Sequence, residues 1–245
     1  QLSRCPADLV RLTNEAQLEL VEQLPPGRAF GSIAVHPGAV SESMRAIEVY
    51  ATEHGFVQVG EILGYALGFD LDSPEMIEIA RHAAHFGLPL QCHCSTSGQP
   101  EGEQFFQAVN LARQVPEAKV IAAHAIGGTN SWMHITGAQI YYATGGANLW
   151  LEIRDFNTRS YLRAAVRRLG ADRLIVGTDW IGHSKEPYLP YGVLFNTKLE
   201  EMPYPCSSSS LAGFLREAGC NEAEIDLMAA GNSVRLFGLE HRLGS

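Results

Sequence analysis

The sequence has no apolar run near the length of a membrane-spanning helix, and positive charge is scarce. Its 245 residues include 18 Lys and Arg against 27 Asp and Glu, which gives a net charge of −9. A helix that crosses a bilayer needs roughly 18 or more consecutive apolar residues. Nucleic acids and anionic membranes are bound by a basic face. The composition therefore argues against a membrane protein and against nucleic acid as the main partner.

Targeting and disulfide patterns are also missing. The first six residues lack the basic-then-apolar order of a secretory signal, and the chain begins with Gln rather than Met. We therefore expect a chain that is processed or lacks its start. The five cysteines are odd in number and include no Cys-x-x-Cys. They fit free thiols in a reducing cytoplasm better than a disulfide framework, so we expect a cytoplasmic protein.

The sequence instead contains short apolar runs that alternate with amphipathic segments from end to end. No Ser- or Pro-rich linker divides them, so we expect a single domain over residues 1–245. The apolar runs predict strands over residues 29–35, 56–61, 88–93, 119–124, 148–153 and 173–179. The amphipathic segments predict helices over about 42–54, 73–87, 103–114, around Trp132 and Ile135, and over 157–169, 207–218 and 222–230.

Strands that alternate with helices at this spacing indicate βαβ units and a parallel sheet. A closed barrel of this type needs eight strands, and the sequence predicts six. We therefore predict an α/β fold, a TIM (β/α)8-type barrel that lacks the first two βα units in this chain. An open doubly wound sheet is the alternative, but such a sheet concentrates its site at one crevice. The polar residues at four strand ends favour the barrel.

Those four residues are Glu61, His93, His124 and Asp179, each at or just past the end of a predicted strand. In a parallel barrel, residues in this position converge on one mouth, where active sites are built. Two imidazoles and two carboxylates form a ligand set suited to a catalytic divalent metal. The sequence therefore predicts a metal site made by these four side chains.

Five motifs in order resemble the amidohydrolase superfamily, and most closely its amidohydrolase-related (amidohydrolase 2) branch of predicted metal-dependent hydrolases. They are Val59-Gly60-Glu61, Leu88-Pro89-Leu90-Gln91-Cys92-His93, Ala122-Ala123-His124-Ala125-Ile126-Gly127-Gly128, Gly177-Thr178-Asp179-Trp180 and the run from Ala230 to Gly238. The first also resembles TatD-type deoxyribonucleases. The resemblance covers about residues 29 to 239. It implies a TIM barrel in which Asp179 binds the metal and takes the proton from the attacking water.

One family feature is missing, because these families end the first strand in a His-x-His pair and no such pair occurs here. Absence of the first strands from this chain explains this. The alternative is a barrel that has lost its metal, as some lactonase relatives have.

Four further residues are candidates for substrate binding, each with a structural alternative. His36 follows the first predicted strand and could line the mouth or form a turn before Pro37. Trp180 and His183 follow Asp179 and could contact substrate or pack within the loop. Arg154 follows the fifth strand and could bind an anionic substrate or form a surface salt bridge.

Three functions are compatible with these patterns. The first is a metal-dependent hydrolase that cleaves a small amide, ester, lactone or phosphoester. The second is a metal-dependent non-oxidative decarboxylase of the same superfamily, in which Asp179 manages protons and Arg154 anchors a carboxylate. The third is a degenerate barrel without catalysis. The expected cofactor is a divalent ion, zinc before manganese or magnesium. The expected partner is a small-molecule substrate, with TatD-like nuclease activity a minor alternative and a homodimer a further expectation.

Overall fold

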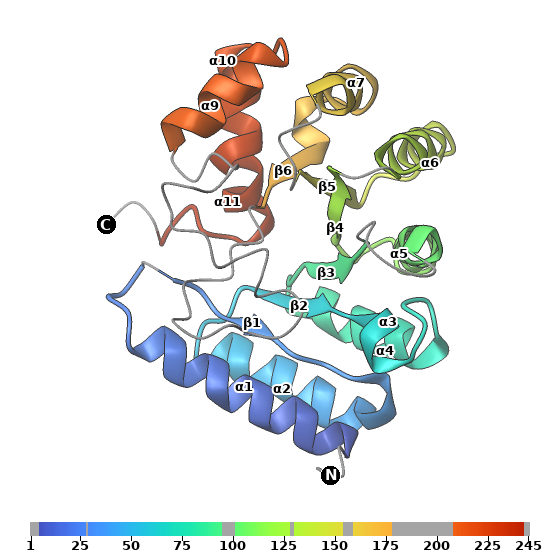
Figure 1. The fold of residues 1–245 in the computed structure, drawn as a ribbon. Coiled ribbons are helices and arrows are strands. Elements are labelled where there is room, and N and C mark those ends of the chain that lie inside the picture. The colour runs from blue at the N-terminus through green and yellow to red at the C-terminus, as the bar shows by residue number, and fades with distance from the viewer. Residues whose placement is uncertain are drawn as a thin grey trace, which may run out of the picture.

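The computed structural model describes residues 5–27, 29–94, 101–127, 130–153, 159–177 and 208–242 of the chain (Figure 1). Six parallel strands form one sheet in the order β1-β2-β3-β4-β5-β6, so each strand pairs with its neighbours in sequence. They are β1 (Ser32–Ile33), β2 (Gln58–Ile62), β3 (Leu90–His93), β4 (Val120–Ile126), β5 (Leu149–Ile153) and β6 (Leu174–Val176). Helices surround the strands on the outside (Figure 1). The fold is α/β of the TIM-barrel type, as predicted, and the described sheet is not closed.

The predicted helices form with small shifts of their ends. They are α2 (Val40–Thr52), α4 (Pro74–His85), α5 (Glu101–Gln114), α6 (Ser131–Ala143), α7 (Arg159–Leu169), α9 (Ser208–Glu217) and α10 (Glu222–Asp226). The start of α4 follows from its sequence, since the Ser73 hydroxyl accepts a hydrogen bond from the Met76 amide and Pro74 occupies the first turn.

Two helical segments were not predicted. The first helix, α1 (Pro6–Glu22), was not predicted; it packs against α2 (Figure 1). Its buried Asn14 side chain donates to the carbonyl of Ala34 and accepts from the Ala34 amide, which ties α1 to the chain just after β1.

The second is a helix that follows the one predicted over residues 222–230. A π-helical turn, η4 (Leu227–Gly231), leads directly into α11 (Asn232–Leu236). Asn232 is buried, and its side-chain amide donates to the carbonyls of Ala171 and Leu174 beside the start of β6. These bonds hold α11 against the sheet. The remaining short elements are α3 (Gly64–Leu67), η1 (Pro37–Ala39) and η2 (Ala171–Arg173).

The two faces of the sheet carry different side chains. The main apolar core lies between the sheet and the helices, and Leu90 and Cys92 of β3 belong to it. A second, smaller cluster contains Ile121, Ile175 and Leu236, with Trp150 and Phe237 packed on it. Because side chains alternate along a strand and Gln91 pairs with Ile121, which pairs with Trp150, these residues share the inner face.

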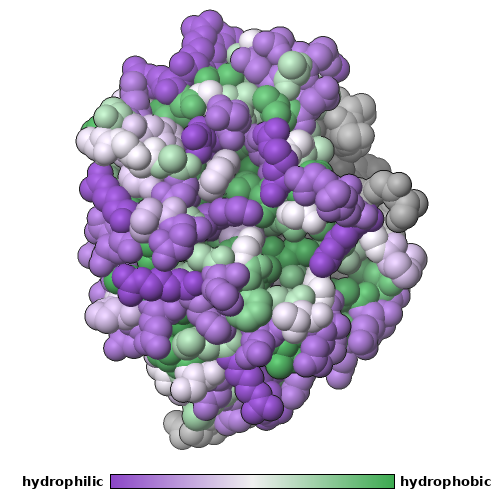
Figure 2. All heavy atoms as spheres, turned by 180° about the vertical axis from the view of Figure 1, so that it is seen from behind, coloured by the Kyte–Doolittle hydropathy of each residue, from purple (hydrophilic) through white to green (hydrophobic). Residues whose placement is uncertain are grey.

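The inner face therefore changes character along the strands. It is apolar near their starts and carries His93 and Glu152 toward their carboxyl ends. On the face of the molecule seen in Figure 2, hydrophilic side chains cover most of the rim and hydrophobic side chains gather near the middle. None of the described helices is both long and apolar enough to span a bilayer.

A glycine brings β2 close to β3 beside the site. Gly60 has a φ of 120°, and a Cβ atom there would collide with the main-chain oxygen of Gln91. Gly87 also has a positive φ, 71°, but a Cβ atom there would meet nothing. We expect Gly87→Ala to lower the free energy of unfolding by about 1 kcal/mol, the cost of backbone strain alone. Gly60→Ala adds a collision with the neighbouring strand, so we expect a loss of more than about 2 kcal/mol.

Urea denaturation of the two variants measures the difference. Equal losses for Gly60→Ala and Gly87→Ala would contradict the close approach of β2 and β3.

Candidate metal centre

The structure brings three of the four predicted site residues together. Glu61 lies on β2, His93 ends β3 and His124 lies on β4, so the cluster spans three adjacent strands. The Oε1 atom of Glu61 is 2.6 Å from Nδ1 of His93 and 3.0 Å from Nε2 of His124. One potential ligand atom from each side chain lies within 4.8 Å of those of the other two. This is the geometry that the parallel sheet and the strand-end positions predict.

Irregular backbone orients these side chains. The register between β2 and β3 shifts between Val59 and Ile62, and the register between β4 and β5 shifts between Ala122 and Ile126. Such irregularities re-aim side chains at active sites. His124 has a φ of 58°, a left-handed conformation that costs a non-glycine residue about 1–2 kcal/mol. Strain of this kind occurs where surrounding structure fixes a functional side chain.

The charges in the cluster stabilise one another. Burial raises the pKa of Glu61, but the imidazoles of His124 and His93 outweigh burial and lower this pKa to about 2. Burial lowers the pKa of His124, but the carboxylates of Glu152 and Glu61 outweigh burial and raise this pKa to about 10. Without a metal ion, Glu61 is therefore an anion near neutral pH and His124 is an imidazolium.

Glu152 is a fourth member of the site that the sequence reading missed. Its side chain is only 4% exposed, and its Oε1 atom lies 3.2 Å from Nδ1 of His124. The sequence contained a signal, because an acidic residue within the apolar run from Leu149 to Ile153 has no reason to be buried without a partner. The strand was predicted, but the inward position of Glu152 beside His124 depends on the pairing of β4 with β5.

Two other described side chains bear on the site: Tyr65 lies beside it, and His36 was predicted to line it. The Tyr65 ring of α3 is 4.8 Å from the His93 ring, centre to centre. His36 accepts a hydrogen bond from the Gly38 amide at Nδ1, and its ring meets the edge of Phe69. These contacts give His36 the turn role that was its alternative, and its substrate-binding role stays a prediction. The predicted residues Arg154, Asp179, Trp180 and His183 lie outside the described residues.

The two cysteines beside His93 do not belong to the cluster. Cys92 and Cys94 are fully buried, and Cys92 belongs to the core between the sheet and the helices. Burial, with a smaller effect of the Glu61 charge, raises the pKa of Cys92 to about 12. Burial also raises the pKa of Cys94 well above its ordinary value. Both side chains lie in the apolar core and outside the cluster of possible ligands, so they are not placed to bind an ion there.

The donor set fits a divalent metal ion. Ligands held at 2.0–2.2 Å from one ion are separated from each other by about 3–4 Å. The distance of 3.0 Å from Glu61 to His124 lies at the lower end of this range, and the distance of 2.6 Å to His93 is shorter, so a small outward movement of these side chains would admit an ion. A carboxylate oxygen and two imidazole nitrogens suit zinc and manganese, and three ligands leave positions for further ligands.

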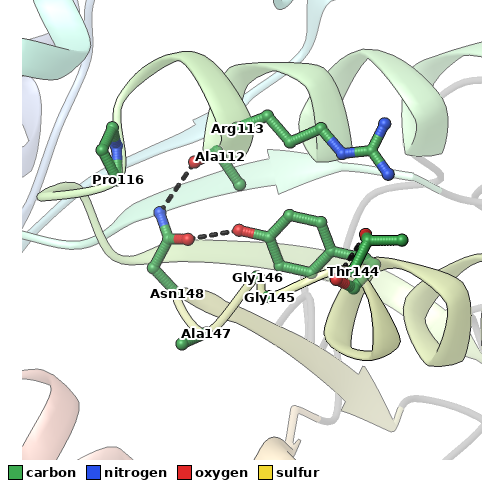
Figure 3. Close-up of a pocket in the computed structure, with 9 residues that line it drawn as sticks. Ala112, Arg113, Pro116, Thr144, Gly145, Gly146, Ala147 and Asn148 are labelled. Carbon is green, nitrogen blue, oxygen red and sulfur yellow. Dashed lines mark hydrogen bonds between the residues drawn. The ribbon is translucent and has the colours of Figure 1, made fainter.

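Of the hollows in the described part of the chain, two are the largest, and both lie outside the cluster. The larger, about 570 Å³, lies where α5 and α6 end and β5 begins, at the opposite end of the strands (Figure 3). There the Asn148 amide group donates to the carbonyls of Ala112, Val115 and Ala118, so its polar groups hold the fold together. A smaller hollow of about 220 Å³ lies beside the Tyr65 ring that contacts His93, and Gln104 and Gln107 also line it.

The sequence matches the family model described as amidohydrolase over residues 7–239, nearly its whole length. The chain belongs to the amidohydrolase family. This finding confirms the resemblance drawn from the five motifs. No curated protein matches this amidohydrolase in sequence.

Solved structures with the same fold include decarboxylases and a hydrolase. A dihydroxybenzoic acid decarboxylase from Polaromonas, with bound manganese and the inhibitor 2-nitroresorcinol, is 17% identical, with a TM-score of 0.62 over 98% of this chain and 78% of that chain. The 5-carboxyvanillate decarboxylase from Sphingomonas paucimobilis is 18% identical, with a TM-score of 0.60 over 95% and 73%.

A protein named as a probable 2-pyrone-4,6-dicarboxylic acid hydrolase, from Acinetobacter baumannii with citric acid bound, is 16% identical. Its TM-score is 0.59 over 92% of this chain and 78% of that chain. At these identities the likeness establishes the fold. Together with the cluster of Glu61, His93 and His124, the family supports a divalent-metal enzyme that acts on a small molecule. It does not distinguish a hydrolase from a decarboxylase.

Proposed function

We propose that this amidohydrolase is a metal-dependent, non-oxidative decarboxylase of a small hydroxylated aromatic acid. The observation that carries the proposal is the cluster of one carboxylate and two imidazoles at the carboxyl end of the sheet. Support for decarboxylation over the hydrolysis first expected comes from the similar structures, several of which are named as decarboxylases of hydroxylated benzoic or vanillic acids. The proposed catalytic unit is one domain over residues 1–245.

The proposed metal ligands are Glu61, His93, His124 and Asp179, and we propose manganese as the ion, with zinc as the alternative. Manganese is favoured because it is the ion in the decarboxylase from Polaromonas and in a 5-carboxyvanillate decarboxylase from Novosphingobium aromaticivorans. Two carboxylates would balance the charge of a divalent ion, and neutral imidazoles would complete the set.

The reaction breaks the bond between the ring and the carboxylate, releases carbon dioxide and places a proton on the ring carbon. When bound, the ion would supply positive charge that stabilises the negative charge of the substrate acid. Asp179 is the proposed group that handles the proton, and Arg154 is proposed to anchor the substrate carboxylate. The Tyr65 ring beside His93 offers an aromatic wall for the substrate ring. His36, Trp180 and His183 remain proposed substrate contacts.

A panel of hydroxybenzoic and vanillic acids tests the proposal. We expect at least one acid with a hydroxyl next to the carboxylate to release carbon dioxide in the presence of Mn²⁺. A chelator should abolish the release, and added Mn²⁺ should restore it. Turnover that is unaffected by chelation, or no release from any acid, would contradict the proposal.

Hydrolysis is the second candidate, favoured by the likeness to the 2-pyrone-4,6-dicarboxylic acid hydrolase. In this reaction Asp179 would take the proton from the attacking water. Lactones, amides and phosphoesters added to the same panel separate the candidates. Turnover of only these compounds would favour hydrolysis.

A further inference from the structure

A chain of polar side chains, of which Glu152 is buried and Gln58 and Gln91 are partly buried, lies behind His124 on the inner face of the sheet. The Nε2 group of Gln58 donates to Oε1 of Gln91 at 3.1 Å, and Nε2 of Gln91 donates to Oε2 of Glu152 at 2.6 Å. The other oxygen of Glu152 faces Nδ1 of His124 at 3.2 Å. The chain therefore crosses β2, β3 and β5 and ends at an imidazole on β4.

The packing around Glu152 leaves its carboxylate little freedom. Its side chain is almost completely buried, and Gln91 fixes one of its oxygens. On its other side the carboxylate lies against Gly177, where a Cβ atom would collide with it. A buried carboxylate is costly unless charged or polar groups pair with it, so both oxygens need the partners that they have here.

The two nitrogens of His124 are thereby distinguished. A carboxylate oxygen can only accept, so a negative oxygen 3.2 Å from Nδ1 favours a hydrogen on Nδ1. Nε2 lies on the other side, 3.0 Å from Glu61, within the cluster with His93. A neutral imidazole with a hydrogen on Nδ1 presents its lone pair at Nε2, which is the form that a metal needs.

We propose that Glu152 is a positioning residue that fixes the tautomer and ring orientation of His124, and that Gln91 holds Glu152 in place. The inference rests on the proposed metal site and adds Glu152, which lies outside the five motifs, together with Gln91 of the second motif. It explains why the carboxylate of Glu152 is buried on the inner face, and why the partly buried Gln91 donates to it. Outer partners of this kind change metal affinity or activity by about 10- to 100-fold when they are replaced.

Mn²⁺ affinity, measured by calorimetry on the whole protein, is the first test. We expect Glu152→Ala to weaken Mn²⁺ binding by about 10- to 100-fold. Glu152→Gln keeps the volume and can still present an oxygen to Nδ1, so its loss should be smaller. Gln91→Leu, which frees Glu152 to rotate, should also weaken binding. Gln139→Met is the matched control, since Gln139 lies on the exposed surface of α6, where it accepts a hydrogen bond from Arg168; the affinity of this variant should stay near that of the wild type.

A second readout separates positioning from folding. In protein labelled with ¹⁵N-histidine and loaded with diamagnetic Zn²⁺, the ring-nitrogen shifts show which nitrogen of His124 carries the hydrogen. We expect Nδ1–H in the wild type and in Glu152→Gln, and a loss of this single state in Glu152→Ala. Thermal melting of the metal-free proteins confirms that the variants are folded.

The outcomes distinguish this inference from the proposed function. Wild-type affinity and an unchanged His124 tautomer in folded Glu152→Ala would overturn the positioning role alone. Weakened Mn²⁺ binding in this variant, with no carbon dioxide released from any acid by the wild type, would support the positioning role and overturn the proposed reaction. A wild-type protein that binds neither Mn²⁺ nor Zn²⁺ would overturn both.

Discussion

Replacement of His124 by Ala is expected to weaken Mn²⁺ binding by on the order of 10³-fold and to abolish metal-dependent turnover. The expected loss exceeds the roughly 10- to 100-fold effect of residues that act through a ligand, because a ligand itself is removed. The same result is expected for His93→Ala, since both imidazoles contact Oε1 of Glu61 in the cluster. Calorimetry with Mn²⁺ and metal content after dialysis measure the loss.

His82 provides the matched control for these variants. It is a half-buried histidine on α4 whose ring packs against Phe86, and it does not belong to the cluster. His82→Ala removes the same group and should leave Mn²⁺ affinity unchanged. Equal affinities for His82→Ala, His93→Ala and His124→Ala would mean that the ion, if any, binds elsewhere.

Mn²⁺ affinity is expected to rise steeply with pH, the second large effect. His124 has a pKa of about 10 without metal, because Glu152 and Glu61 outweigh the effect of burial, so it carries two ring hydrogens at neutral pH. Its Nε2 hydrogen must leave before Nε2 can bind a cation, and binding then releases about one proton. The affinity should therefore rise about tenfold per pH unit, or about 100-fold between pH 6 and pH 8.

Titrations in buffers with different heats of ionisation measure the released proton directly. The observed heat should change from buffer to buffer in proportion to about one proton per bound ion. An affinity that is flat with pH, with no proton released, would contradict the role of His124 as a ligand.

The same groups predict how the stability of the metal-free protein depends on pH. The pKa of Glu61 is lowered from 4.5 to about 2, so its contribution is complete above pH 4.5 and is lost as the pH falls through about 2. The pKa of His124 is raised from 6.5 to about 10, so its contribution is complete below pH 6.5 and is lost as the pH rises through about 10. Urea denaturation should therefore show the cluster at its full effect between about pH 4.5 and 6.5. A cluster contribution that keeps growing up to pH 10 would contradict these assignments.

Much of the site follows from the sequence because a parallel sheet imposes the geometry. Glu61, His93 and His124 each follow an apolar run of strand length, and strands that pair in chain order place such residues at one edge. The helix predicted from residue 73 begins where its sequence indicates, with Ser73 as the N-cap before Pro74. The apolar runs, the N-cap residue and the rule that parallel strands end at one edge of the sheet were enough to predict the three clustered residues and the start of α4.

What the sequence could not supply depends on pairing between distant segments. The sequence around Glu152 predicts a strand but does not say which residue lies beside Glu152. The pairing of β5 with β4 places its side chain next to His124. The left-handed backbone at His124 has no sequence marker, since nothing local requires it. Helix α1 was missed because its apolar face is sparse, and Asn14, a polar residue, is what anchors it.

A crystal structure of the protein with Mn²⁺, using anomalous scattering to locate the ion, tests the central claim most directly. We predict one anomalous peak about 2.0–2.3 Å from a carboxylate oxygen of Glu61 and from ring nitrogens of His93 and His124. A peak elsewhere, or no peak with Glu61 still paired directly to both imidazoles, would contradict it.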